Sequence, residues 1–317
     1  MRTSPSSAET RSSLKFLSPF LFFFVLFLLF PIFYSLYLSF FDASEGFGLS
    51  NLKWVGFSNY VQILGFHFQD GSIKLNDPAF WWSLVVTALY GGISIPLGIF
   101  ASLGLALLLH NKLFGKNFFR SAFFLPNILD MLVVATIWAS IYAPQYGFLA
   151  VLTKNFLGEN QFFFKEGMLA NPYTALPAVI LAMVLKGAGF GMVLFLAALQ
   201  NIPDSVYEAA DIDGASKFQQ FWLITLPLLR PIIFFMFITG IIGSLNAFSE
   251  IYAMTSGGPQ IVLGEETLGS TTVSGFYLYQ QFESGQYGYA AAISYVLLMV
   301  TVILTWIQQR FFPAESH

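Results

Sequence analysis

Long apolar runs alternate with shorter polar stretches along this chain, and the length of the runs is the first structural signal. A helix needs roughly 20 consecutive apolar residues to cross the hydrocarbon core of a bilayer. The runs that approach or exceed this length are residues 16–41, 83–109, 119–143, 173–200, 232–255 and 288–311. The pattern therefore predicts an all-α integral membrane protein with six transmembrane helices.

The first run decides whether the N-terminal region is a cleaved signal or a retained helix. The apolar core of a secretory signal has about 7–15 residues and is followed by a cleavage site of small residues. Residues 16–41 are much longer and no such site follows them, so we expect a retained transmembrane helix. Residues 1–13 are rich in Ser, Thr and Arg and are expected to form a mobile tail, with residues 14–317 as a single transmembrane domain.

The composition agrees with a membrane protein and narrows the chemistry. The chain is 56% hydrophobic and only 10% charged, whereas soluble domains have roughly 25% charged residues. A net charge of −3 gives no reason to expect nucleic acid as a partner. The absence of cysteine excludes disulfides, thiol catalysis and cysteine metal sites. The three histidines lie far apart and indicate no metal cluster.

The distribution of Lys and Arg predicts the orientation in the membrane, because cytoplasmic loops carry an excess of these residues. With six spans, both termini lie on the same side. The residues on that side are Arg2, Arg11, Lys15, Lys112, Lys116, Arg120, Lys217, Arg230 and Arg310. The residues on the opposite side are Lys53, Lys74, Lys154 and Lys165, while Lys186 lies within a span. We therefore expect both termini and residues 201–231 to be cytoplasmic.

Two loops on the opposite, external side are long. Loops of this length are usually functional or disordered. Residues 42–82 contain several aromatic side chains, and there a functional loop and a solvated connector are equally consistent with the sequence. Residues 256–287 contain no Lys or Arg and carry three Glu residues, which favours a functional loop.

The cytoplasmic segment 201–231 has the sequence signals of two short helices. Ser205-x-x-Glu208 is a capping-box pattern that predicts a helix start. Gly214 fits the position just after a helix end, where a left-handed backbone is needed. Ser216-x-x-Gln219 is a second capping-box pattern. A simple connection between membrane helices would need only a turn, so this segment is expected to bind to another surface.

The surface to which this segment binds is either lipid or another protein. Helices that lie on lipid favour Lys and Arg. The segment is acidic instead, and its acidic residues are Asp204, Glu208, Asp211 and Asp213. Small side chains at Ala209, Ala210 and Gly214 also allow another backbone to approach closely, so a protein partner is the better interpretation.

These residues carry a resemblance to a known family. The stretch "EAADIDGA", followed by "FWLITLPLLRP", resembles the EAA loop of the membrane subunits of ABC importers. The stretches "FFRSAFFLPNIL", "LAALQNIPDSVYEAADIDGAS" and "NAFSEIYAMTSGGP" resemble the carbohydrate-uptake, maltose-type branch of that family. The resemblance implies a cytoplasmic coupling helix that docks in a groove of an ATP-hydrolysing subunit. It assigns this contact to Glu208, Ala209, Ala210, Asp213 and Gly214.

The resemblance also implies the partners: a second permease subunit, two ATP-binding subunits, an external substrate-binding protein and a sugar-like substrate. The chain itself is not expected to hydrolyse ATP. A phosphate-binding loop needs G-x-x-x-x-G-K-[ST], and the fragment Gly115-Lys116-Asn117 lacks the hydroxyl residue and the first glycine. No cofactor is therefore expected in this chain, with ATP and Mg²⁺ held by the partner ATPase.

Ionisable residues within membrane spans mark functional sites by default, because their insertion is costly. Three stand out: Asp130, Lys186 and Glu250. Asn127 lies three residues before Asp130, and Asn246 lies four before Glu250, so each pair is expected on one helical face. Hydrogen-bonding groups of this kind suit the hydroxyls of a sugar.

Aromatic and small residues extend this predicted polar path. Phe190 shares a helical face with Lys186 and offers an aromatic surface to a sugar. The resemblance assigns substrate contact to Asn127, Lys186, Gly187, Phe190 and Asn246. A structural alternative stays open, in which Lys186 pairs with Glu250 or Asp130 and the asparagines join helices. For Gly187-x-x-x-Gly191, with Gly189 between, close helix packing is the favoured role.

The stretch "TSGGPQ" follows the fifth run on the external side. Gly257, Gly258 and Pro259 suit a tight turn. In the resembling family this stretch begins the loop that meets the substrate-binding protein. A simple helix exit is the alternative.

These observations predict a multi-pass permease subunit of an ATP-driven importer for a sugar, oligosaccharide or sugar-derived osmolyte, located in a bacterial inner membrane. The alternative is a proton-coupled secondary transporter in which Asp130, Lys186 and Glu250 relay protons. It accounts for the charges but not for the capped cytoplasmic helices. An intramembrane enzyme is disfavoured because no convincing nucleophile–base pair or metal set is present in the sequence.

Overall fold

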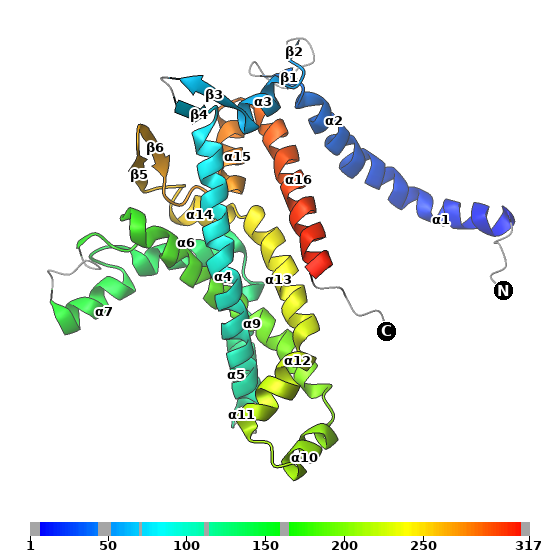
Figure 1. Cartoon of the computed structure of the whole chain (residues 1–317), viewed down its shortest axis with the longest axis vertical. Coiled ribbons are helices and arrows are strands. Elements are labelled where there is room, and N and C mark those ends of the chain that lie inside the picture. The colour runs from blue at the N-terminus through cyan, green and yellow to red at the C-terminus, as the bar shows by residue number, and fades with distance from the viewer. Residues whose placement is uncertain (1–6, 44–51, 70–71, 111–113, 159–164, 312–317) are drawn as a thin grey trace. The chain divides into compact units, whose positions relative to one another are not determined.

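The computed structural model describes residues 7–43, 52–69, 72–110, 114–158 and 165–311. The chain divides into two compact units. The first, unit 1, comprises Met1–Asp77 and Leu278–Leu298, and the second, unit 2, comprises Pro78–Tyr277 and Met299–His317. Figure 1 shows that helices dominate the chain and that its strands form short hairpins.

The N-terminal helix of unit 1 is long and apolar. It consists of α1 (Ser7–Phe24), a π-helical segment (Val25–Leu29) and α2 (Phe30–Leu38). Near its end, the Ser35 hydroxyl and the Tyr295 hydroxyl lie 3.2 Å apart. Tyr295 belongs to α16 (Tyr287–Phe311), so a polar contact joins α2 to the part of α16 that lies in unit 1.

Residues 42–82 are largely built into regular structure where the structure describes them. Strand β1 (Phe41–Asp42) pairs with β2 (Lys53–Trp54), and β3 (Phe66–Gln69) pairs with β4 (Ser72–Leu75), both antiparallel. Helix α3 (Ser58–Leu64) lies between the hairpins in sequence. The Asn59 amide donates hydrogen bonds to the Ser39 and Phe41 carbonyls, which fixes α3 against the end of the first helix.

Unit 2 is built around two long helices, α4 (Pro78–His110) and α9 (Pro172–Gln200), which lie side by side in Figure 1. Their contact is apolar. The buried side chains of the core cluster at this contact, joined by Leu229 from further along the chain, are Leu103, Ala106, Leu109, Met192, Phe195, Leu196, Leu199 and Leu229. Helix α13 (Arg230–Leu245) packs on α4, and α5 (Lys116–Ile128) packs on α9.

Shorter elements complete unit 2. They are α6 (Met131–Tyr142), α7 (Phe148–Leu157), α10 (Asp204–Ile212), α11 (Lys217–Gln220), a π-helical segment (Phe221–Thr225), α12 (Leu226–Leu228), α14 (Ser249–Met254), β5 (Gln260–Leu263), β6 (Glu266–Gly269) and α15 (Ser274–Glu283), which continues into unit 1.

Within the described ranges, four helices are long and apolar enough to cross a membrane. They are Lys15–Leu38, Pro78–His110, Pro172–Gln200 and Tyr287–Gln308. Two bent pairs pass the same test together: Lys116–Ile128 with Met131–Tyr142, bent by 103°, and Lys217–Leu228 with Arg230–Leu245, bent by 59°. The number of spans is therefore four to six, and six is reached when each bent pair counts as one span.

The third predicted span, 119–143, is not one continuous helix. Helix α5 ends at Ile128, Leu129 is extended, and Asp130 is the N-cap of α6, where its side chain accepts a hydrogen bond from the Leu132 amide at 2.9 Å. Aspartate favours this position because its carboxylate satisfies a free helix N–H. The prediction that Asn127 and Asp130 share one helical face is therefore wrong.

The fifth predicted span, 232–255, is also broken. Asn246 is the C-cap of α13, and α14 begins at Ser249, after a gap in the helix. Asn246 and Glu250 therefore do not share a face of one helix, contrary to the prediction. The break changes the direction in which the chain presents Glu250.

Candidate functional site

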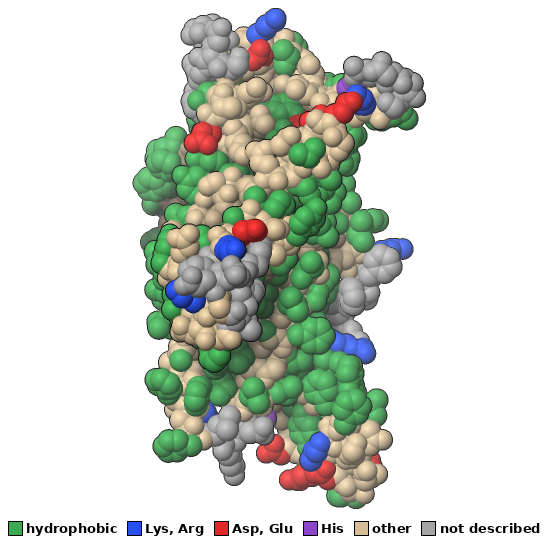
Figure 2. Space-filling view, turned by 90° about the vertical axis from the view of Figure 1, so that its left-hand side faces the viewer, with side chains coloured by type: hydrophobic (Ala, Val, Ile, Leu, Met, Phe, Trp, Pro, Cys, Tyr) green, Lys and Arg blue, Asp and Glu red, His purple; other side chains and the backbone are tan. Residues whose placement is uncertain are grey.

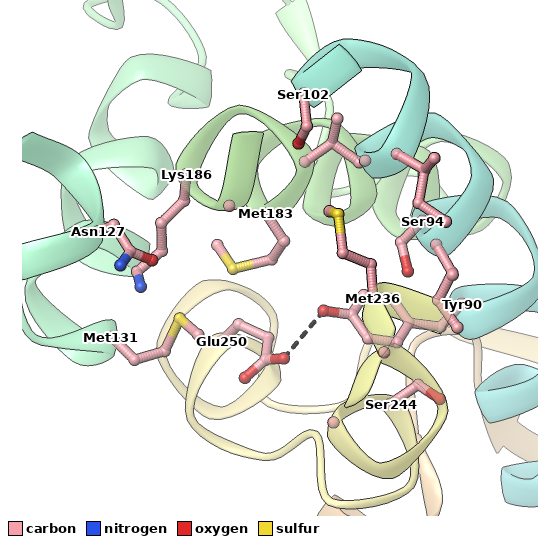
Figure 3. A pocket seen from close by; sticks show the side chains of 17 residues that line it. Tyr90, Ser94, Ser102, Asn127, Met131, Met183, Lys186, Met236, Ser244 and Glu250 are labelled. Atoms are coloured by element: carbon pink, nitrogen blue, oxygen red, sulfur yellow. Dashed lines mark hydrogen bonds between the residues drawn. The ribbon is translucent and has the colours of Figure 1, made fainter. Parts of the chain in front are cut away.

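A cavity of about 330 Å³ opens among the helices of unit 2. Helices α4, α5, α6, α9, α13 and α14 all contribute to its wall. The polar side chains of the wall are Tyr90, Ser94, Ser102, Asn127, Lys186, Ser244 and Glu250. Apolar side chains, among them three methionines, fill the space between them (Figure 3). A small concave site with a few convergent polar groups is typical of ligand-binding pockets.

The carboxylate of Glu250 forms one polar end of this pocket. Glu250 lies in the first turn of α14 and is only 6% exposed. The Tyr90 hydroxyl on α4 donates a hydrogen bond to Glu250 Oε1 at 2.9 Å, drawn as a dashed line in Figure 3. The break between α13 and α14 thus aims a buried carboxylate at the pocket, where a tyrosine stabilises it.

The side chains of Lys186 on α9 and Asn127 on α5 point toward each other at another end of the pocket (Figure 3). Among the residues that the structure describes, Lys186 makes no ion pair with Glu250 or Asp130, so this part of the structural alternative is not observed. The pocket therefore carries an amine and an amide at one end and a carboxylate at the other.

The structure brings together some of the sequence-predicted site residues and separates others. Asn127, Lys186 and Glu250 line the pocket, as does Gly187. Three predicted residues lie outside its lining, and each has another environment. Asp130 is the exposed N-cap of α6, Phe190 is 45% exposed, and the exposed Asn246 side chain donates to the Ile242 carbonyl of its own helix at 2.8 Å. Without Asp130, the three ionisable residues of the proton relay do not meet in one site.

Sequence reasoning missed the contribution of α4 to the pocket. Tyr90, Ser94 and Ser102 lie within its long apolar run. Polar residues that recur in an apolar run were an available signal. Their spacing of four and eight residues brings them roughly to one face of a helix.

The glycines near Lys186 have different roles. A Cβ at Gly189 would lie 1.9 Å from the Phe123 carbonyl oxygen, and one at Gly191 would lie 2.3 Å from Ser102 Oγ. These two glycines serve close helix packing, as predicted. A Cβ at Gly187 would meet nothing within 4 Å, so Gly187 instead leaves space beside the pocket.

The second candidate region is the segment of α10 and α11. Helix α10 begins at Asp204 after the N-cap Pro203, so Ser205 is inside the helix and the capping box predicted there is wrong. The end of α10 is as predicted: Gly214 has a φ of +76° and follows the C-cap Asp213. The Ala215 amide then donates to the Ala210 carbonyl at 2.9 Å, and the Gly214 amide to the Asp211 carbonyl at 3.1 Å. This pair of bonds is the Schellman motif.

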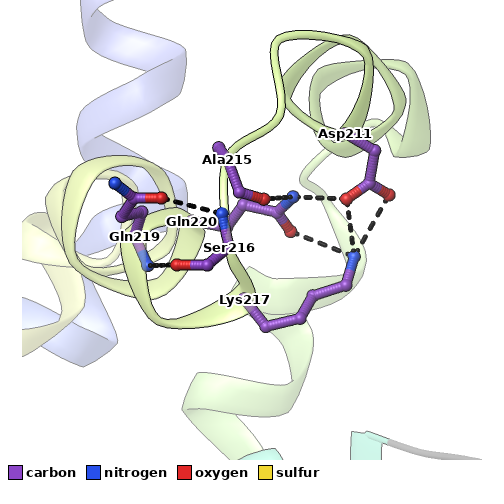
Figure 4. A network of polar contacts seen from close by, with 6 residues as sticks. All are labelled: Asp211, Ala215, Ser216, Lys217, Gln219 and Gln220. Carbon is purple, nitrogen blue, oxygen red and sulfur yellow. Dashed lines mark hydrogen bonds and ion pairs between the residues drawn. The ribbon is translucent and has the colours of Figure 1, made fainter.

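The start of α11 confirms the second predicted capping box, formed by Ser216 and Gln219. The backbone N–H of Gln219 donates to Ser216 Oγ at 3.3 Å, and the backbone N–H of Ser216 donates to the side-chain oxygen Oε1 of Gln219 at 2.8 Å. Figure 4 shows these reciprocal bonds. The capping box and the Schellman motif together fix the chain on both sides of the turn between α10 and α11.

Side chains lock the two short helices together (Figure 4). Lys217 Nζ lies 2.9 Å and 3.1 Å from the two carboxylate oxygens of Asp211. The buried side-chain amide of Gln220 donates to Asp211 Oδ1 at 2.6 Å and to the Ala215 carbonyl at 3.1 Å. We call Asp211, Lys217 and Gln220 the α10–α11 junction. It holds α10 at a defined angle to α11.

The surface of α10 and α11 is open to a partner. Glu208, Ala209 and Asp213 are exposed, whereas Ala210 is buried and packs inside the chain. Large apolar side chains are exposed beside them: Ile212 is 86% and Phe218 73% exposed. In Figure 2, acidic side chains gather at the lower end of the face shown, where α10 lies.

The α10–α11 junction is expected to be insensitive to pH near neutrality and to fail in acid. The hydrogen bonds from Lys217 and then Gln220 hold the pKa of Asp211 below its ordinary value of 3.8. A lowered folded-state pKa means that the stabilisation is present above the ordinary value and is lost as the pH falls through the folded value. A nitroxide label at the exposed position 212 should keep the same mobility from about pH 8 to pH 5 and become more mobile only below about pH 4.

The matched variant Lys217→Met should give a mobile label at every pH, because it removes the partner that holds Asp211. A rise in label mobility between pH 8 and pH 5 in the unsubstituted protein would contradict this account of the junction.

The predicted tight turn after α14 is present. Ser256 and Gly257 have φ values of +49° and +81°, and the Gly258 amide donates to the Thr255 carbonyl at 3.0 Å. Gly257 is buried, and a Cβ there would lie 2.5 Å from Phe276 Cε1. Its carbonyl also accepts a hydrogen bond from the Thr272 hydroxyl at 3.0 Å. Gly257 therefore has an internal packing role, and the turn leads into the β5–β6 hairpin.

Apolar spans, a polar pocket among them and an exposed, rigid helical segment together define a membrane transport subunit. The family described as "Binding-protein-dependent transport system inner membrane component" matches residues 94–316. The chain belongs to this family, which confirms the resemblance carried by the EAA loop. It is thus a multi-pass permease subunit of a binding-protein-dependent transporter and not an enzyme.

Relatives match almost the whole chain. A probable ABC transporter permease of Bacillus subtilis (strain 168) is 36% identical over 93% of this chain and 94% of the relative. A lactose transport system permease of Rhizobium radiobacter is 32% identical over 98% and 99%. A multiple sugar-binding transport system permease of Streptococcus mutans is 37% identical over 90% and 89%.

Solved structures agree in fold. A chain of a bacterial ABC transporter involved in the import of the acidic polysaccharide alginate superimposes with a TM-score of 0.72. The two sequences are 22% identical, and the match covers 96% of this chain and 97% of that chain. At this identity the likeness supports the fold alone.

Proposed function

We propose that this chain is the permease subunit of an ATP-driven importer for a sugar, oligosaccharide or sugar-derived osmolyte, and that the pocket of unit 2 is its substrate passage. The observation that carries the proposal is the convergence of Tyr90, Asn127, Lys186 and Glu250 on one pocket among apolar helices. These groups donate and accept hydrogen bonds, as the hydroxyls of a sugar require. Relatives named for lactose, multiple sugars and arabinooligosaccharides support the substrate class.

The α10–α11 segment is proposed to couple the pocket to ATP hydrolysis in a partner subunit. Its exposed acidic and apolar side chains form the docking surface, and the junction makes it a rigid lever. The segment continues through α12 to Leu229, which is fully buried between α4 and α9. Beyond Leu229, α13 carries Met236 and Ser244 of the pocket wall. A displacement of α10 would therefore reach the pocket through packed side chains.

The complete transporter would contain a second permease subunit, two ATP-binding subunits and an external substrate-binding protein. ATP and Mg²⁺ would be bound by the ATPase subunits. The chain would span a bacterial inner membrane six times, with each bent helix pair as one span and both termini in the cytoplasm. Residues 14–317 would act as one transmembrane domain, and the turn at Gly258 and Pro259 would lie near the binding protein.

Purification of the tagged chain from its native membrane in mild detergent tests this proposal. An ATPase and a second permease are expected to co-purify, and a sugar delivered by the binding protein should stimulate ATP hydrolysis by the reconstituted complex. Isolation of the chain alone as a stable particle, with uptake driven by a pH gradient in the absence of ATP, would instead establish a secondary transporter.

A further inference from the structure

The amine of Lys186 in the pocket of unit 2 has no ion-pair partner among the residues that the structure describes. Lys186 projects from α9 into the pocket, and within the part of the chain that the structure describes no carboxylate lies within ion-pairing distance of its amine. A charge in a membrane interior is costly unless it is paired or solvated. The site therefore favours a ligand that brings a negative charge to Lys186.

The side chain beside Lys186 is a hydrogen-bond donor rather than an acid. The Asn127 amide lies beside it, on α5 (Figure 3). An amine and an amide together suit the oxygen atoms of an anion.

The opposite end of the pocket has the complementary chemistry. The Glu250 carboxylate accepts one hydrogen bond, from Tyr90. A carboxylate has about four acceptor positions, so it can still accept bonds from the hydroxyls of a sugar. It would also repel an acidic group placed at this end, which gives a bound ligand a preferred direction.

We propose, on the basis of the function proposed above, that the pocket selects sugars that carry a carboxylate. The acidic group binds at Lys186 and Asn127, and the sugar hydroxyls bind at Glu250. The volume of about 330 Å³ lies at the lower end of the range for ligand pockets.

The test uses the complete reconstituted transporter with its binding protein. The probes are matched pairs of methyl glycosides: methyl glucuronide against methyl glucoside, and methyl galacturonide against methyl galactoside. Substrate-stimulated ATP hydrolysis and uptake are measured for each pair. The unsubstituted transporter should prefer the uronide, and Lys186→Gln should reduce this preference about tenfold. A tenfold change is about 1.4 kcal/mol, close to the lower end for a hydrogen bond to a charged group. Because all variants use the same binding protein, its own selectivity cancels from the comparison.

Two further variants make the result specific. Lys186→Arg keeps the positive charge and should retain the preference for the uronide. Lys154→Gln makes the same chemical change on α7, outside the pocket lining, and should also leave the preference unchanged.

The outcomes separate the two proposals. Stimulation by neutral glycosides equal to that by uronides, unaltered by Lys186→Gln, would overturn the acid-sugar inference while the importer function stands. Failure of the Lys186→Gln complex to assemble, with rescue by Lys186→Arg, would assign Lys186 to an ion pair with another subunit and would also overturn it. If no glycoside of either kind stimulates ATP hydrolysis, the acid-sugar inference is rejected, while the importer function, which also covers oligosaccharides, stands on its own test.

Discussion

Replacement of Gly189 by alanine is expected to destabilise the folded protein severely, whereas the same replacement at Gly187 is expected to be tolerated. The added Cβ at position 189 would lie 1.9 Å from the Phe123 carbonyl oxygen and 2.6 Å from its carbon. Both are backbone atoms of α5, so the clash is relieved only if α5 moves away from α9. Overpacking of this kind costs typically about 1–3 kcal/mol and more when backbone must shift.

The measurement is the thermal stability of the detergent-solubilised protein, followed by fluorescence-detected size exclusion. Gly189→Ala should lower the melting temperature by several degrees or more, or give no monodisperse peak. Gly187→Ala is the matched control, because a methyl group there meets nothing within 4 Å. Equal stability of the two variants would show that α5 and α9 are not in close contact.

A larger side chain at position 187 distinguishes an effect on helix packing from an effect on substrate transport. Because Gly187 lines the pocket and has open space beside it, Gly187→Leu should preserve the folded protein and reduce uptake. Folding and transport are thus expected to respond to glycines that lie two residues apart on the same helix.

Replacement of Gly214 by valine is expected to reduce ATP-dependent uptake about tenfold without loss of the membrane-inserted protein. Gly214 has a φ of +76° and ends α10 in a Schellman motif. A β-branched residue in this left-handed conformation costs roughly 1–2 kcal/mol, which is close to the 1.4 kcal/mol of a tenfold change. A Cβ at this position meets no neighbour within 4 Å, so the effect comes from backbone conformation alone.

Gly214→Asn is the control for this prediction, since asparagine adopts the left-handed conformation at helix ends more readily. Uptake and ATP hydrolysis of the reconstituted complex are measured for both variants. The asparagine variant should retain most of the uptake, and the valine variant should hydrolyse ATP with little transport. If valine and asparagine give the same uptake, the angle between α10 and α11 does not matter for coupling.

Local interactions explain what the sequence by itself determined. The apolar runs predicted the membrane class because spanning a bilayer requires length and hydrophobicity, both of which are sequence properties. Gly214 and the capping box of Ser216 and Gln219 were correct because their hydrogen bonds join residues within one or two turns. The EAA loop also pointed to the family from a short stretch of sequence.

Only the tertiary structure decided where helices break and which side chains meet. The side chain of Asp130 can either cap α6 or face a pocket, and in the folded protein it caps α6. The break after Asn246 redirected Glu250 toward Tyr90, which lies 160 positions away in the chain. The pocket, its contribution from α4 and the different roles of Gly187 and Gly189 all depend on contacts between helices. Such contacts have no fixed spacing along the chain, which is why hydrophobic periodicity could not predict them.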